Sequence, residues 1–230
     1  MPAIAKLSLK KATARTPQIV TFIIDDSGSM SMSTPNGPKN EQATAATQQL
    51  IMTMQSWNQG STGSRYILNI AKFGTTTVPI VEAAKPEDVS LNDLVFSADS
   101  GTTEMPEALT WAMHALKKSL DGCKQVPGYA EEASPNPLVI FFSDGGNTGG
   151  EVGTIAQALK SLPFAGGAVD VVAVGIGMDQ STFPIMQEIA SRSDLSVNLE
   201  PGELGNFIAD VGATLQRGES PETLIKKYDS

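Results

Sequence analysis

The stretch IVTFIIDDSGS, residues 19–29, decides the fold of this chain and suggests a chemistry. Its first part, residues 19–24, is an apolar run rich in β-branched side chains, which is typical of a strand buried in a parallel sheet. A polar turn follows at once, with a carboxylate at Asp25, hydroxyls at Ser27 and Ser29, and a glycine between the serines that lets the backbone turn back. Such hard oxygen groups suit Mg²⁺ or Mn²⁺ better than Zn²⁺ or Cu²⁺. The stretch therefore predicts a strand end that carries part of a cation site.

Apolar, strand-like segments alternate with segments of helical periodicity along the rest of the chain. This alternation predicts βαβ units around a mostly parallel sheet. Strands are expected at residues 19–24, 65–73, 77–81, 137–142 and 169–176, with a short sixth strand before the last helix. Helices are expected around residues 43–57, 103–120, 155–162 and 204–215, with one more before the sixth strand.

The segments 65–73 and 77–81 are separated by only a few residues, including Gly74. Such a connection is too short for a parallel crossover, so the two segments should form an antiparallel hairpin. Pro79 places the second segment at the sheet edge, because proline cannot donate a ladder hydrogen bond. The expected fold is α/β: a three-layer, doubly wound, mostly parallel six-stranded sheet with one antiparallel edge strand.

A second aspartate, Asp144, follows the predicted strand 137–142 on a glycine-bearing turn. Open α/β sheets bind ligands beyond the carboxyl ends of their strands, where the strand order reverses. If the two strands are neighbours there, Asp25 and Asp144 converge. Thr103 precedes the long helix and is a third candidate. The alternative for Thr103 is a simple helix N-cap, with Pro106 and Glu107 in the first turn.

The charge balance argues against two classes of partner. With 16 basic and 25 acidic residues and a pI near 4.6, the chain offers no electrostatic footprint for nucleic acid or an anionic membrane. No window approaches the roughly 20 apolar residues that span a bilayer. The single cysteine, Cys123, allows no internal disulfide, which favours a reducing compartment, the cytoplasm.

Residues 1–17 form a basic N-terminal arm with four basic and no acidic residues. We expect a solvated leader rather than a signal peptide, because lysines interrupt any apolar stretch. Residues 18–216 should form the single domain, and residues 217–230 a polar and mobile C-terminal tail. Residues 121–136 are long for a helix-to-strand connection, and we interpret them as a tolerated surface loop rather than a partner-binding insertion.

Three motifs together resemble those of the von Willebrand factor A domain: DDSGSM at residues 25–30, GTTEMPEAL at 101–109 and SDG at 143–145. The resemblance covers residues 18–216 and implies a Rossmann-like fold. In that family the three motifs build a metal-ion-dependent adhesion site. The three motifs are highly specific as a set.

The resemblance implies a role for five residues. Ser27 and Ser29 would bind the metal directly, and Asp25 mostly through water. Thr103 and Asp144 would bind directly or through water, depending on the conformational state. The metal would be Mg²⁺, with Mn²⁺ or Ca²⁺ as alternatives, and no residue is expected to be catalytic or to bind another cofactor.

The resemblance also implies a partner. Family members often leave one coordination position for a carboxylate of another protein, so we expect a protein partner that presents an acidic residue. The short form and the wording of residues 22–30 are most like bacterial TerY-type proteins, which are associated with tellurite resistance and with kinase and phosphatase partners. Two departures stand out: Asp26 occupies a position that is more often neutral, and Thr102 replaces a second glycine. Asp26 would either add negative charge to the site or point away from it.

Two other functions are consistent with parts of the pattern. A magnesium-dependent phosphotransfer or hydrolytic enzyme could use Asp25 as a nucleophile. The haloacid-dehalogenase form of that chemistry needs a second carboxylate two residues on, where Ser27 stands. An extracellular adhesion domain with the same site is the other alternative.

Overall fold

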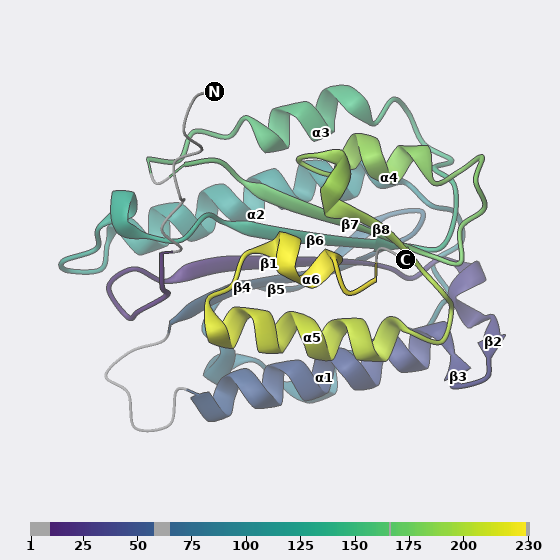
Figure 1. Cartoon of the computed structure of the whole chain (residues 1–230), viewed down its shortest axis with the longest axis horizontal. Coiled ribbons are helices and arrows are strands. Elements are labelled where there is room, and N and C mark those ends of the chain that lie inside the picture. Colours follow the sequence, from purple (N-terminus) through teal and green to yellow (C-terminus); the bar gives the residue numbers. More distant parts are fainter. Residues whose placement is uncertain (1–9, 58–64, 166, 229–230) are drawn as a thin grey trace.

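A six-stranded sheet runs through the middle of the protein, whose computed structural model describes residues 10–57, 65–165 and 167–228 (Figure 1). The strand order is β5-β4-β1-β6-β7-β8. The strands are β1 (Gln18–Asp25), β4 (Tyr66–Phe73), β5 (Thr77–Ala84), β6 (Leu138–Ser143), β7 (Asp170–Ile176) and β8 (Ser196–Leu199). All neighbours are parallel except β4 and β5, so the predicted antiparallel edge strand is confirmed.

Helices cover both faces of this sheet (Figure 1). They are α1 (Lys39–Trp57), α2 (Met105–Lys124), α3 (Gly153–Lys160), α4 (Pro184–Ile189), α5 (Leu204–Arg217) and α6 (Pro221–Ile225). Helices α1, α5 and α6 lie on one face, and α2, α3 and α4 lie on the other. The predicted three-layer, doubly wound α/β fold is confirmed.

The central strands are apolar because both of their faces are covered. In β1 every residue from Ile19 to Asp25 is buried, and all six residues of β6 are buried. Aromatic rings join the strands to each other and to the helices: Phe73 of β4 packs on Phe141 of β6, and Phe142 packs edge-on against Phe207 of α5. In the edge strand β5 only Val81 is buried, as expected for an edge strand that contains Pro79.

The strand order reverses between β1 and β6. From β1 the chain crosses to β4 on one side, whereas β6 is followed by β7 and β8 on the other. The register pairs Ile24 with Phe142, so the residues that follow, Asp25 and Ser143, leave the sheet side by side. This is the position at which open α/β sheets bind ligands.

Two segments differ from the expectation. Helix α2 continues to Lys124, so the first residues of the expected 121–136 loop are helical. Residues 218–228 pack on the domain: α6 buries Leu224 and Ile225, and Tyr228 packs edge-on against Phe207. Of the basic arm, residues 1–9 lie outside the described residues.

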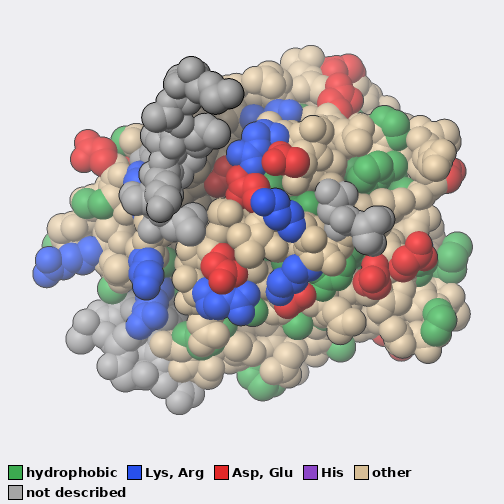
Figure 2. All heavy atoms as spheres, viewed as in Figure 1, with side chains coloured by type: hydrophobic (Ala, Val, Ile, Leu, Met, Phe, Trp, Pro, Cys, Tyr) green, Lys and Arg blue, Asp and Glu red, His purple; other side chains and the backbone are tan. Residues whose placement is uncertain are grey.

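Charge is mixed on the face of the molecule that Figure 2 shows, where basic and acidic side chains are interspersed. In the described ranges, we find no helix with the length and apolar character needed to cross a membrane.

Candidate metal centre

Asp25 is fully buried at the end of β1 and both of its carboxylate oxygens accept hydrogen bonds. The Ser27 amide donates to Oδ1 at 2.8 Å, and the Ser143 hydroxyl donates to Oδ2 at 2.5 Å. Burial raises the pKa of Asp25, and the hydrogen bonds from Ser143 and Ser27 oppose that rise. A cation beside this carboxylate would favour its ionised form.

Ser27 and Ser29 lie in a tight turn that follows β1, with a 3₁₀ helix at Gly28–Ser31. Their hydroxyl oxygens are 3.1 Å apart. The Ser29 hydroxyl also donates to Oδ1 of Asp144 at 2.5 Å. A serine hydroxyl that donates its hydrogen bond to a carboxylate keeps the lone pairs of its oxygen available for a cation. The Ser29 hydroxyl thus lies between the Ser27 hydroxyl and the Asp144 carboxylate and contacts both.

Thr103 is held in place by the loop after β6. Its amide donates to the Thr148 hydroxyl at 3.0 Å, and its carbonyl accepts from the Thr148 amide at 2.9 Å. The alternative role as an N-cap is wrong: α2 begins at Met105, whose amide is bound by the Asn147 side chain at 3.2 Å, and the N-cap position is Glu104. Thr103 is nevertheless buried, and its hydroxyl lies near Gly145 in the turn after β6.

Gly145 shows how closely the loops approach. A methyl carbon placed on Gly145 would lie 3.7 Å from the Thr103 hydroxyl oxygen and 3.8 Å from that of Ser29. Both hydroxyls therefore lie within van der Waals distance of one point beside Gly145. The three predicted segments converge there, and the structure brings together all five predicted residues, Asp25, Ser27, Ser29, Thr103 and Asp144.

The donor set fits a hard divalent cation. It consists of three hydroxyls and two carboxylates, and magnesium and calcium are bound by oxygen in proteins. Within the described ranges, no group of three or more His, Cys, Asp or Glu side chains could hold a metal ion. A cation at this point would therefore depend on the serine and threonine oxygens.

Asp26 points away from this cluster, which decides between its two predicted roles. Its carboxylate accepts from the Ala98 amide at 2.8 Å and from the Ser100 hydroxyl at 3.0 Å, and it pairs with Lys72 at 3.0 Å. The side chain is fully buried. Asp26 thus anchors the loop that leads to Thr103, and Lys72 compensates its charge.

Thr102, the other departure from the family pattern, is accommodated without strain. It is exposed, and its backbone lies outside the left-handed region, so the position does not require glycine. Its amide donates to the Thr75 hydroxyl at 3.1 Å, and the two hydroxyls are 3.2 Å apart. The residue ties the loop to the turn after β4.

Two residues of the cluster were not predicted from the sequence. Ser143, the last residue of β6, binds Asp25 as described. Lys39, the first residue of α1, is 3% exposed, and its ammonium donates to Oδ2 of Asp144 at 2.7 Å. Ser143 stands directly before Asp144 and could have been found from its place at a strand end. Lys39 gives no such signal, because no motif contains it.

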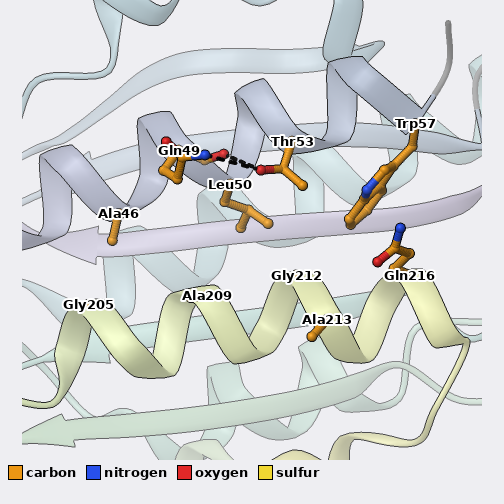
Figure 3. Close-up of a pocket in the computed structure, with 10 residues that line it drawn as sticks. All are labelled: Ala46, Gln49, Leu50, Thr53, Trp57, Gly205, Ala209, Gly212, Ala213 and Gln216. Atoms are coloured by element: carbon orange, nitrogen blue, oxygen red, sulfur yellow. Dashed lines mark hydrogen bonds between the residues drawn. The ribbon is translucent and has the colours of Figure 1, made fainter.

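A separate groove of about 270 Å³ lies between α1 and α5 (Figure 3). Leu50 and Trp57 from α1 face the small residues Ala209 and Gly212 of α5 across it. Its lining holds no ionisable side chain, so it lacks the groups for acid–base chemistry. The groove is not part of the oxygen-rich cluster.

Comparison with solved structures shows the same fold in proteins of low sequence identity. Proximal thread matrix protein 1 from the mussel byssus superposes with a TM-score of 0.60 at 18% identity over 88% of this chain. The pilus adhesin SpaC from Lactobacillus rhamnosus GG gives 0.62 at 14% identity over 95%, and a von Willebrand factor type A protein from Catenulispora acidiphila gives 0.60 at 16% over 87%. This chain spans 49%, 32% and 43% of those three chains.

One structure of the mussel protein is described as having a zinc-occupied MIDAS motif, the metal-ion-dependent adhesion site. A search of curated proteins found no match. The family model for the von Willebrand factor type A domain matches residues 20–207, which include all three motifs. The chain therefore belongs to the von Willebrand factor type A domain family.

Proposed function

We propose that this domain is a metal-dependent protein-binding module. Asp25, Ser27, Ser29, Thr103 and Asp144 hold a divalent cation, and the cation binds a carboxylate of a partner protein. The observation that carries the proposal is that the Ser29 and Thr103 hydroxyls meet beside Gly145, with the Ser27 hydroxyl 3.1 Å from that of Ser29. Neutral hydroxyls compensate less of the charge of a cation than carboxylates do, so the bound ion keeps an attraction for an anionic ligand.

The surroundings of Asp25 support binding rather than chemistry. A nucleophilic aspartate needs an accessible oxygen, but Asp25 is fully buried and both oxygens already accept hydrogen bonds, from the Ser27 amide and the Ser143 hydroxyl. His114, the only histidine of the chain, is exposed on α2, so serine or cysteine chemistry has no histidine near this cluster. The phosphotransfer alternative therefore has no geometric support.

The metal and the partner are proposed from chemistry. Hard oxygen ligands favour Mg²⁺ or Mn²⁺, with Ca²⁺ as the next choice. The single cysteine favours a cytoplasmic setting over an extracellular one. A kinase or phosphatase partner in tellurite resistance rests only on the resemblance to TerY-type proteins, and partner capture is the experiment that tests it.

Thermal unfolding with and without metal tests the proposal. Millimolar Mg²⁺ or Mn²⁺ should raise the melting temperature, since a ligand at a hundred times its Kd stabilises by about 2.7 kcal/mol. Asp25→Ala and Ser27→Ala should abolish the shift, whereas Ser31→Ala, an exposed serine of the same turn, should keep it. No shift for the wild-type protein over the millimolar range would refute the metal site.

Partner capture tests the second half of the proposal. Partner proteins retained by the immobilised domain in Mn²⁺ should be released by a chelator and absent from the Asp25→Ala column. A partner that is retained in chelator and by Asp144→Ala would bind elsewhere on the domain.

A further inference from the structure

Lys39 places a buried positive charge directly behind the proposed metal site. Its ammonium lies 2.7 Å from Oδ2 of Asp144 and 3.3 Å from the carbonyl oxygen of Ile176, the last residue of β7. The side chain is 3% exposed, and that of Asp144 is fully buried. Charges in such surroundings are screened far less than charges at the surface.

The backbone leaves the site after Ser29 and comes back to it at Lys39. A small antiparallel hairpin, β2 (Ser33–Thr34) and β3 (Gly37–Pro38), reverses the chain, and Gly37 adopts a φ of +98° that favours glycine. The Lys39 amide then donates to the Met32 carbonyl at 3.2 Å. The position of the ammonium is thus fixed by the fold rather than by a flexible surface contact.

Asp144 faces two different groups with its two oxygens. Oδ1 accepts from Ser29, on the side of the hydroxyl cluster, whereas Oδ2 accepts from Lys39. The ammonium therefore does not occupy the space beside Gly145, and a cation there would share Asp144 with it. Lys39 has two opposite effects on such a cation: it orients Asp144, and it repels a second positive charge.

We infer that Lys39 sets the charge of the metal-loaded site. It lowers the affinity for the metal and raises the attraction for an anionic partner. This inference rests on the proposed function. The two carboxylates, Asp25 and Asp144, formally cancel a divalent cation, and Lys39 then leaves the loaded site with one positive charge. Asp26 adds no compensating charge, because it is turned away and paired with Lys72. The ligand class that this charge favours is a carboxylate or another anion.

Titration with Mn²⁺ alone tests the inference. Lys39→Met removes the charge and should tighten Mn²⁺ binding on the order of tenfold or more, because like charges repel strongly in a buried site. Lys39→Gln keeps a donor for Asp144 and should also bind Mn²⁺ more tightly. Lys39→Arg keeps the charge and should bind with an affinity near that of the wild type.

Lys72→Met is the matched control, because it also removes a lysine that pairs with a buried aspartate, at 3.0 Å. It should change Mn²⁺ affinity much less than Lys39→Met. Melting temperatures without metal show that each variant is folded. With Mn²⁺ saturating, an N-acetylglutamate probe should bind Lys39→Met and Lys39→Gln at least threefold more weakly than wild type.

The outcomes separate the two proposals. If the wild type binds Mn²⁺ and the neutral variants bind it equally or more weakly, Lys39 only positions Asp144 and the inference is wrong, whereas the metal site stands. If neither the wild type nor the neutral variants bind Mn²⁺, the proposed function fails together with the inference. Binding by the neutral variants alone would support the inference in its strongest form.

Discussion

The Ser143 hydroxyl donates a 2.5 Å hydrogen bond to Oδ2 of Asp25, and this bond joins the ends of the two strands at which the sheet order reverses. Asp25 and Ser143 are 118 residues apart in the chain. The contact exists because β1 and β6 pair in parallel and end in register. It fixes the orientation of the first carboxylate of the proposed metal site.

Ser143→Ala should therefore weaken both the fold and the site. Removing one partner of a buried carboxylate costs about 1.5–3 kcal/mol of unfolding free energy. Loss of a group that orients a metal ligand typically weakens metal affinity by about 10–100-fold. Denaturant unfolding and Mn²⁺ titration measure the two effects. Ser31→Ala is the control and should change neither by much, because Ser31 is exposed and its hydroxyl donates to the Gly28 carbonyl of its own turn. Unchanged Mn²⁺ affinity in Ser143→Ala would contradict the orienting role.

Asp26→Asn should separate stability from metal binding. The substitution weakens the pair with Lys72 and the hydrogen bonds from Ala98 and Ser100, so we expect a loss of about 1.5–3 kcal/mol, the range for hydrogen bonds to charged groups. Metal affinity should change by less than about threefold. Asp26 lies outside the oxygen cluster, and in the wild type Lys72 already compensates its negative charge. Urea unfolding and Mn²⁺ titration test this, with Asp25→Asn as the comparison. A stable Asp26→Asn protein that no longer binds metal would place Asp26 in the site.

The sequence predicted the parts of the site that follow from local pattern. An apolar run that ends in Asp25 and another that ends near Asp144 indicate two buried parallel strands, and parallel strands present their carboxyl ends at one edge. Lys39 could not be found this way, because its contact with Asp144 depends on a hairpin and on a neighbour 105 positions away. The direction of Asp26 was also open, since sequence does not show which face a residue takes once a strand has ended.

The N-cap alternative for Thr103 failed for a similar reason. A threonine shortly before a helix is a common cap, but here the first helical amide is bound by Asn147, which comes from another loop. Competition between a local and a distant hydrogen-bond partner is decided by the tertiary structure. The same holds for residues beyond 217, whose polar composition hides the two apolar residues, Leu224 and Ile225, that pack on the domain.

Cys123 should be unreactive in the folded protein. Burial raises the pKa of its thiol to about 11, and the side chain is 3% exposed in α2. At pH 8 alkylation by iodoacetamide should thus be much slower in native protein than in denaturant, since the thiolate is the nucleophile. Because the folded-state pKa lies above the ordinary value of 9.0, the unfolded chain loses its proton first, and stability should fall as pH rises from about 9 to 11. Mass spectrometry is unambiguous, as the chain has one cysteine. Equal alkylation rates in native and denatured protein would contradict the burial.

Gly145→Ala should weaken metal binding without unfolding the domain. The new methyl carbon would meet the hydroxyl oxygens of Thr103 and Ser29 at 3.7 and 3.8 Å, which are ordinary contact distances, and the backbone of Gly145 is not in the left-handed region. Stability should therefore stay within about 1 kcal/mol of the wild type.

The methyl group would nevertheless fill the space between the hydroxyls, where metal–oxygen bonds of about 2.0–2.6 Å leave no room for a carbon atom. Mn²⁺ affinity should fall roughly tenfold or more, and the melting-temperature shift should shrink accordingly. Gly28→Ala is the matched control in the turn after β1: nothing lies within 4 Å of its added carbon, so metal binding should persist. If Gly145→Ala bound Mn²⁺ as tightly as Gly28→Ala, the cation would not lie beside Gly145, and the site would have to be sought elsewhere on the domain.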